Sequence, residues 1–217
     1  SGGSGGRLAR GKGMGMNAEG RVNLTRAGAD GPGRFLGALA GPPASGKSTL
    51  AETLARDLSP GARVVPMDGF HYDDAVLDAR GLRSRKGSPP TFDAMGFLHL
   101  IRRLREEDEV AIPIFDRSME LSRAGADIVT PEDRILIVEG NYLLLDEDPW
   151  HRLAPMFDLT VFLDVPEEEL VRRLTARWKA HGREDQAARD WIASNDLPNA
   201  LTVITRSLPA EITLRNM

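Results

Sequence analysis

The 217-residue chain is 41% hydrophobic, which is enough for one sizeable core and not clearly enough for two. Its 28 Lys and Arg against 32 Asp and Glu give a formal charge of −4, which argues against broad binding to nucleic acid or to an anionic membrane. The lack of cysteine excludes disulfides and thiolate metal sites, and no stretch approaches the roughly 18 to 20 apolar residues of a membrane span. We therefore expect a cytoplasmic protein with neither a nucleic-acid nor a membrane partner.

The first 16 residues are poor in apolar side chains. Ser1–Gly6 contains only Gly and Ser, and Gly11–Met16 is similar. Neither segment has the apolar middle of a signal peptide. We interpret residues 1–16 as a flexible linker or expression-derived sequence, with Met16 as a natural start. Residues 17–217 are then expected to form one domain.

Short apolar segments alternate with helical patterns along the first half of the chain. Phe35–Ala40 is typical of a buried strand, and Leu50, Leu54 and Leu58 form a helical stripe that follows it. Arg63–Met67 predicts a second strand. The pattern becomes helical from Asp93, and Val110–Phe115 is extended, with Pro113 favouring an edge position.

The second half continues the alternation. Ile135–Val138 is the clearest buried strand, and Leu159–Val165 is another. A helix is expected from Pro166, with Leu170, Leu174 and Trp178 on its inner face. Further elements are predicted as two helical stretches and a short strand, at Asp185–Ser194, Pro198–Thr205 and Glu211–Leu214. Alternating strands and helices indicate an α/β domain with a parallel sheet covered on both faces.

A phosphate-binding motif follows the first strand. Gly41–Ser48 matches G-x-x-x-x-G-K-[ST] and lies between an apolar strand and an amphipathic helix. Its backbone amides can surround phosphates, Lys47 can reach the β- and γ-phosphates, and Ser48 can bind Mg²⁺. Lys47 is expected in a solvent-facing loop. ATP and Mg²⁺ are thus the predicted cofactors, with nucleotide contacts from Gly41, Pro42, Pro43, Ala44, Ser45, Gly46, Lys47, Ser48 and Thr49. The alternative is a Gly-rich turn that caps a helix without a ligand.

Two carboxylates end predicted strands at the edge that carries the phosphate loop. Asp68 follows the second strand, where it could accept the proton of an attacking hydroxyl or hold a water on Mg²⁺. It could equally cap the turn before Gly69. Glu139 ends the Ile135–Val138 strand and is the expected acidic partner of the metal, beside Ser48. A solvent-exposed strand-end Glu is the alternative.

Other polar residues near these strand ends are weaker candidates. His71 could contact the substrate or only cover the turn. Asp116 and Arg117 follow the Pro113 strand and could reach a substrate hydroxyl and a phosphate, although a surface ion pair fits as well.

Basic residues cluster twice. Arg80, Arg83, Arg85 and Lys86 fall within seven residues, and Arg173 and Arg177 lie four apart on one helix, followed by Arg183. Such runs are usually solvated faces. Cations on a closing lid can, however, stabilise the charge that develops during phosphoryl transfer. We expect such a lid around residues 172–195.

Together these blocks resemble the P-loop kinases of the uridine kinase, phosphoribulokinase and bacterial pantothenate kinase superfamily. The branch that they resemble most is the one labelled fructose transport system kinase, or nucleoside/nucleotide kinase-like protein. The resemblance runs from about Arg34 to the C-terminus. It rests on Gly41–Ser48, Met67–His71, Arg85–Pro89 with Thr91–Asp93, Ile114–Arg117, Val138–Leu144 and Asn195–Ala200.

The resemblance implies a role for each block. Asp68 is the implied catalytic base and Glu139 the acidic end of the Walker B strand, while Arg173 and Arg177 begin the lid. It implies an acceptor pocket lined by Arg85, Lys86, Phe115, Asp116 and Arg117. It also implies a five-stranded parallel sheet and a homodimer as a candidate assembly.

The predicted function is phosphoryl transfer from ATP to a hydroxyl of a small metabolite, with a sugar such as fructose ahead of other acceptors. A nucleoside or pantothenate-type acceptor is the alternative within the superfamily. Phe115-Asp116 stands where pantothenate kinases have a Tyr/His pair, which argues against pantothenate. A nucleotide-dependent switch without an acceptor, and a relative that binds ATP without turnover, are the remaining hypotheses.

Overall fold

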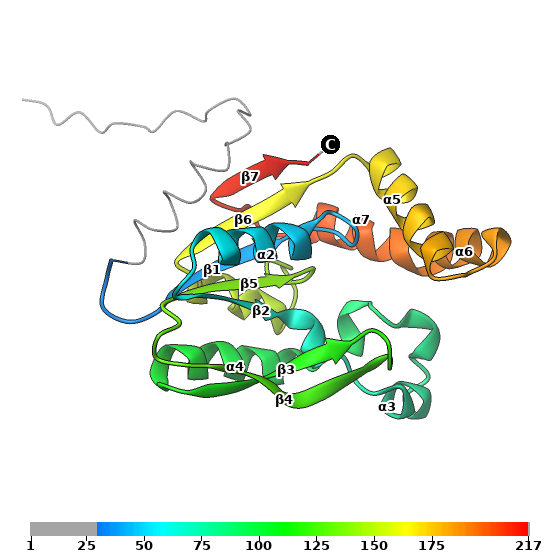
Figure 1. Ribbon diagram of the computed structural model, residues 1–217. Helices are drawn as coiled ribbons and strands as arrows, with labels where there is room; N and C mark the ends of the chain where they lie inside the picture. Colours follow the sequence, from blue (N-terminus) through cyan, green and yellow to red (C-terminus); the bar gives the residue numbers. More distant parts are fainter. Residues whose placement is uncertain (1–29, 217) are drawn as a thin grey trace, which may run out of the picture.

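The computed structural model describes residues 30–216, so the interpretation of residues 1–16 lies outside the described part. Its centre is a five-stranded sheet in which all neighbouring strands are parallel, in the order β2-β5-β1-β6-β7 (Figure 1). The strands are β1 (Phe35–Ala40), β2 (Ala62–Pro66), β5 (Ile135–Gly140), β6 (Leu159–Asp164) and β7 (Ile212–Arg215). The predicted α/β class and five-stranded parallel sheet are confirmed.

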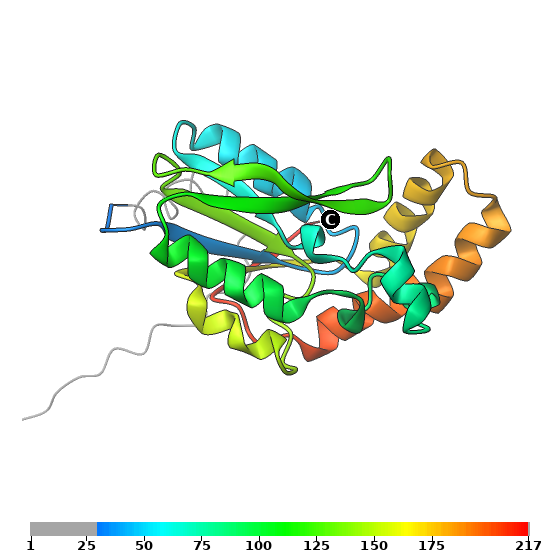
Figure 2. The ribbon, with the colours of Figure 1, turned by 90° about the horizontal axis from the view of Figure 1, so that it is seen from below.

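Alternate residues of the central strand β1 pack into two separate cores. Leu36 and Ala38 face a core shared with α4 (Ala94–Glu106), whereas Phe35 and Leu39 face the core that is covered by α2 (Lys47–Asp57). All six residues of β5 are buried, which explains its uninterrupted apolar sequence. Helices therefore cover both faces of the sheet, as Figures 1 and 2 show.

The strand that contains Pro113 belongs to a separate antiparallel hairpin of β3 (Val110–Asp116) and β4 (Leu121–Val129). The pairing register shifts between Ile112 and Ile114, so Pro113 lies at an irregularity where its missing N–H is tolerated. Most of β4 is exposed or half-buried. Its sequence thus lacks the apolar alternation by which strands are recognised, and β4 was not predicted.

The chain after β6 forms a helical arm that extends beyond the sheet (Figure 2). It consists of α5 (Glu167–Ala180), α6 (Asp185–Trp191), a π-helical turn (Ile192–Asp196) and α7 (Leu197–Arg206). The two helical stretches predicted at 185–194 and 198–205 are therefore joined directly by this turn. The remaining segments include η1 (Met67–Phe70), α3 (Asp74–Ala79) and the short turn η2 (Arg83–Arg85). Among the helices described, none is long and apolar enough to cross a bilayer.

Candidate active site

The phosphate loop curls tightly between β1 and α2. Ala44 has φ 63° and Gly46 has φ 90°, both in the left-handed region that non-glycine residues rarely adopt. A Cβ on Gly41 would lie 2.9 Å from Ser45 Oγ, so only glycine fits there. The loop thus has the compact form in which successive backbone N–H groups can surround an anion at the start of a helix.

Lys47 is buried, which corrects the expectation of a solvent-facing loop residue. Its side chain is folded along the loop, where Nζ donates hydrogen bonds to the Pro42 carbonyl at 2.8 Å and to Ser45 Oγ at 3.3 Å. Burial lowers the pKa of Lys47 to about 8, and the attraction of Glu139 offsets this only in part. The ammonium therefore lies in a poorly hydrated place, where it interacts strongly with any anion in the loop.

The two predicted metal ligands meet at the N-terminus of α2. Ser48 Oγ donates to Glu139 Oε1 at 3.3 Å. Glu139 is buried, and burial raises its pKa to about 7, helped by repulsion from Asp68. A hydroxyl and a carboxylate beside a phosphate loop are the hard oxygen ligands that Mg²⁺ uses in nucleotide sites, so the residues present fit this ion.

Asp68 lies in η1, directly after β2, and its carboxylate lines the same cleft as Lys47 and Glu139. Its Oδ2 accepts a hydrogen bond from the Arg117 guanidinium at 3.1 Å, and about 29% of the side chain is exposed. The carboxylate is thus both held in place and accessible to a small molecule. This is the geometry that a general base needs, because the acceptor hydroxyl must come within hydrogen-bond distance of it.

The ring of His71 supports the Asp68 turn. It packs at a tilt against Phe92 and Phe115, with ring centroids 4.1 and 4.7 Å away, and its Nδ1 lies 2.8 Å from the Asp68 carbonyl oxygen. Burial lowers the pKa of His71, so the ring stays neutral around pH 7. His71 therefore fixes the wall of the cleft behind the Asp68 carboxylate.

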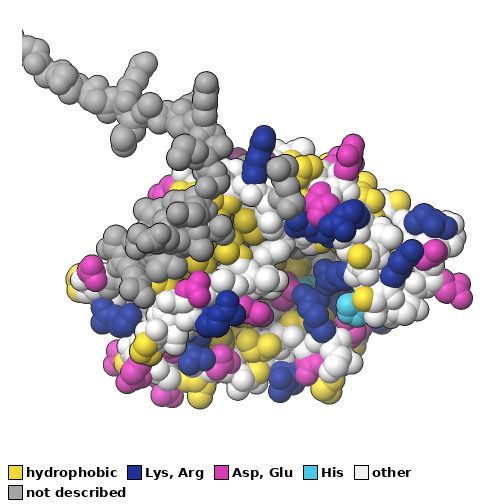
Figure 3. All heavy atoms as spheres, turned by 45° about the horizontal axis from the view of Figure 1, so that its top comes forward, with side chains coloured by type: hydrophobic (Ala, Val, Ile, Leu, Met, Phe, Trp, Pro, Cys, Tyr) yellow, Lys and Arg dark blue, Asp and Glu magenta, His cyan; other side chains and the backbone are white. Residues whose placement is uncertain are grey.

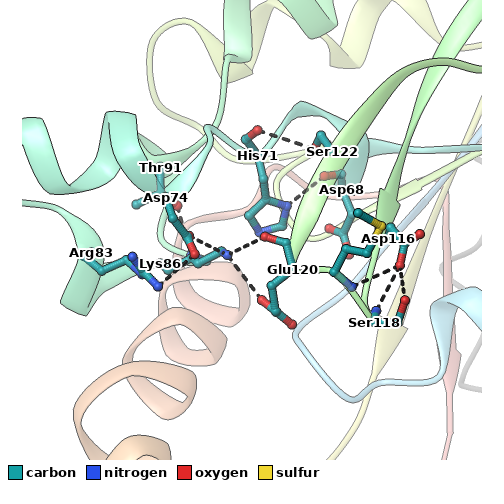
Figure 4. Close-up of polar contacts among 12 residues, drawn as sticks. Asp68, His71, Asp74, Arg83, Lys86, Thr91, Asp116, Ser118, Glu120 and Ser122 are labelled. Atoms are coloured by element: carbon teal, nitrogen blue, oxygen red, sulfur yellow. Dashed lines mark hydrogen bonds and ion pairs between the residues drawn. The ribbon is translucent and has the colours of Figure 1, made fainter.

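A network of ion pairs forms the wall opposite the phosphate loop (Figure 4). Lys86 Nζ lies 2.8 Å from Asp74 on α3 and 3.2 Å from Glu120 at the tip of the β3–β4 hairpin. Arg83 approaches the same Asp74 carboxylate at 2.8 Å. Side chains from three segments thus meet in one place, and this wall presents both carboxylate oxygens and N–H donors.

The helical arm contributes cations and aromatic rings to the cleft. Arg177 lines it, and burial lowers the pKa of its guanidinium. Arg183 lies over the rings of Trp178 and Trp191, 4.4 and 5.1 Å from their centroids. The arm therefore brings two cations and two aromatic rings to the wall of the cleft, and the lid around residues 172–195 stays a prediction.

All of these groups face one cleft of about 660 Å³ between the sheet edge, the hairpin and the helical arm. In Figure 3 the side chains of Lys and Arg gather around this hollow. The cleft is large enough for the phosphates of a nucleotide together with a small acceptor.

Comparison with known proteins agrees with this geometry. A family model described as an AAA domain matches residues 38–191. The Escherichia coli protein YggC, which is itself uncharacterized, is 38% identical over 80% of this chain and 74% of its own. The candidate uridine kinase C227.14 of Schizosaccharomyces pombe is 33% identical over 85% of this chain and 84% of its own. The chain belongs to the P-loop kinases.

A solved structure of this kinase superfamily matches nearly the whole chain. It is a candidate fructose transport system kinase from Silicibacter sp. TM1040, with 45% identity and a TM-score of 0.86. The alignment covers 93% of this P-loop kinase and 99% of that chain. The arrangement of sheet, hairpin and helical arm is thus shared with that candidate kinase.

Most of the site residues expected from the sequence come together in this P-loop kinase. Those that line the cleft are Pro43, Ala44, Gly46, Lys47, Ser48, Thr49, Asp68, His71, Lys86, Phe115, Arg117, Glu139 and Arg177. Gly41, Pro42 and Ser45 also belong to the phosphate loop, but they are buried and do not line the cleft. Three others do not line the cleft: Arg85, Asp116 and Arg173.

Each of these three side chains has another partner or position. Arg173 pairs with Glu169 at 2.6 Å, and its NH1 lies 3.4 Å from the carbonyl oxygens of Ala44 and Ser45, so it braces the phosphate loop from outside. Asp116 accepts hydrogen bonds from the backbone N–H and hydroxyl of Ser118, which closes the hairpin turn. Arg85 is exposed on η2.

Several residues that line the cleft were not expected there from the sequence. They include Asp74, Glu120, Asn141, Trp191, Asp196 and Asn199. Asp74 and Glu120 lie in segments whose sequence has no regular hydrophobic pattern, and they come near Lys86 only when the chain folds. Asp196 and Asn199 belong to the block Asn195–Ala200, whose resemblance to the family was the one available signal.

Proposed function

We propose that the protein transfers the γ-phosphoryl group of ATP to a hydroxyl of a small, neutral, polyhydroxylated acceptor such as a sugar. The observation that carries the proposal is the shared cleft, in which the Asp68 carboxylate faces the phosphate loop with its Lys47 and the Ser48–Glu139 pair. A general base and a phosphate cradle in one cavity are what hydroxyl phosphorylation requires.

The residues of the cleft divide the reaction between them. Lys47 and the loop amides hold the phosphates, and Ser48 and Glu139 would hold Mg²⁺, which neutralises charge on the phosphates when it is bound. Asp68 takes the proton as the acceptor O–H bond breaks and the new O–P bond forms, and the γ-phosphorus separates from ADP. Arg177 stabilises the negative charge that spreads over the transferring group.

The opposite wall supports a neutral acceptor. Lys86 and Arg83 are already paired with carboxylates, so neither is a free cation for a second anionic group. Asp74 and Glu120 leave lone pairs that can accept hydrogen bonds from hydroxyls. The relatives that are named as kinases differ in the compound that their names mention, which is fructose for a transport system kinase and uridine for another.

A nucleoside is the second candidate acceptor. It is favoured by Trp178 and Trp191, whose rings line the cleft and could stack on a base. Arg183 already covers part of both rings, which is why we place the nucleoside second.

The cysteine-free sequence supports action in the cytoplasm, and a homodimer stays a prediction from the family resemblance.

The experiment is a screen of acceptor-dependent ADP release with Mg²⁺ and ATP. The acceptors form a charge series of neutral sugars including fructose, the corresponding sugar phosphates, nucleosides and pantothenate. We expect stimulation by a neutral sugar or polyol and little by its phosphate. A preference for nucleosides would replace the acceptor class. If no acceptor stimulates ADP release, the switch hypothesis replaces the kinase.

A further inference from the structure

The turn Lys86–Ser88, which we call the acceptor loop, sets the position of the ion pairs on this wall of the cleft. Lys86 reaches from it to Asp74 and Glu120, so a shift of its backbone would move all three charged groups. Gly87 has φ 99°, a conformation that L side chains rarely adopt. The loop is therefore a defined structure that must be held by its surroundings.

Side chains from distant segments hold this loop by its carbonyl groups. Asn195 Nδ2 donates to the Lys86 carbonyl at 2.7 Å, and the Tyr142 hydroxyl donates to the Gly87 carbonyl at 2.5 Å. Asn195 is buried, and its Oδ1 accepts from Asn199 Nδ2 at 3.4 Å. The second asparagine thus orients the first with its amide N–H toward the loop.

Asn195 lies in the π-helical turn that joins α6 to α7. The Leu197 N–H donates to the carbonyl of Ile192, five residues earlier, which adds a residue to the turn compared with an α-helix. The neighbouring Asp196 accepts a hydrogen bond from Trp178 Nε1 on α5 at 2.6 Å. Two adjacent residues of one turn therefore attach the acceptor loop and the lid helix to the same point.

We propose that Asn195 is a positioning residue for the acceptor, and that the Asn195–Asp196 turn couples movement of the lid helix α5 to the acceptor loop. The lid carries Arg177 on the phosphate side, so nucleotide binding that draws α5 inward also sets the loop for the acceptor. The proposal rests on the proposed function only in treating the Lys86 wall as the acceptor side.

Hydrogen exchange of the full chain tests this directly. Asn195→Asp keeps the shape of the side chain but replaces the N–H donor by an oxygen that faces the Lys86 carbonyl. Without nucleotide, the variant's acceptor-loop amides should exchange about tenfold faster, the effect of losing one hydrogen bond to a partly buried carbonyl. Asn195→Ala should behave in the same way, and Ser194→Ala, an exposed change in the same turn, should match the parent.

The coupling is tested by adding Mg²⁺ and the non-hydrolysable analogue AMP-PNP. In the parent, exchange should slow in both the phosphate loop and the acceptor loop. In the Asn195 variants the phosphate loop should still be protected and the acceptor loop should not respond. Failure of nucleotide to protect the phosphate loop would count against the proposed function, whereas the comparison without nucleotide tests the positioning role by itself.

Two results would overturn the proposal. One is unchanged acceptor-loop exchange in Asn195→Asp, and the other is a parent protein whose acceptor loop ignores bound nucleotide. With an acceptor from the screen, the variants should show an acceptor KM about tenfold higher and an ATP KM near that of the parent. Equal loss for both substrates would indicate general destabilisation instead.

Discussion

Replacing Glu139 by Gln should make the metal-free, nucleotide-free protein more stable above neutral pH. Burial raises the pKa of this carboxyl from 4.5 to about 7, because the attraction of Lys47 and the Ser48 hydrogen bond only partly compensate for lost hydration. The amide of the Glu139→Gln variant would resemble the protonated, neutral carboxyl and avoid the cost of a buried charge. It keeps an oxygen for the Ser48 hydroxyl.

The sign and size follow from the two pKa values. Below pH 4.5 the Glu139 carboxyl is protonated in both the folded and the unfolded chain, so the folded protein does not carry the cost of a buried charge at this position. As pH rises, the unfolded chain ionises first, so this stability is lost progressively until about pH 7. The difference between 4.5 and about 7 corresponds to about 3 kcal/mol at pH 8, or roughly 6 to 12 °C in Tm for a domain of this size.

The assay is calorimetric unfolding in EDTA at pH 5 and pH 8. Glu139→Gln should unfold at a higher temperature than the parent at pH 8 and within a few degrees of it at pH 5. The control is Glu109→Gln, an exposed carboxyl that should change neither value. A Glu139 variant that is less stable than the parent at pH 8, or equally shifted at both pH values, would refute the reasoning.

The two lid arginines should separate in kinetics. Arg177→Gln should lower kcat by about 10²-fold with a smaller change in ATP affinity, because this guanidinium faces the cleft. Arg173→Gln should instead weaken ATP binding, since it braces the phosphate loop; equal kcat losses in both variants would contradict this division. Lys47→Met should reduce ADP release by about 10²-fold or more and leave the circular dichroism spectrum unchanged. Methionine is chosen because the side chain of Lys47 is buried and needs an apolar replacement of similar size. Parental activity in Lys47→Met would exclude the phosphate-loop assignment.

The sequence predicted the features that depend on local pattern. The apolar run at residues 35–40 and the buried run at 135–138 identified central strands, because strands covered on both faces have little room for polar residues. The fixed positions of Gly41–Ser48 identified the phosphate loop, since its tight curl requires them. Asp68 and Glu139 followed from the rule that parallel strands present their carboxyl ends at one edge.

What the sequence did not predict depends on three-dimensional placement. Arg173 and Arg177 lie four residues apart on one helix, about 6 Å along its axis, which is enough to put one beside the phosphate loop and the other in the cleft. Spacing alone placed both on the same side. Asp74 and Glu120 gave no signal, because their ion pairs with Lys86 join segments that are remote in sequence.

Asp68→Asn, assayed with an acceptor from the screen, tests the central claim most directly. The change keeps the size of the side chain, an oxygen for Arg117 and the whole phosphate loop, but removes the base. Acceptor-dependent transfer should fall by about 10²- to 10⁴-fold, while slow background ATP hydrolysis and ATP affinity change far less. Transfer at the parental rate in Asp68→Asn would contradict the account of this protein as a kinase that uses Asp68 as its base.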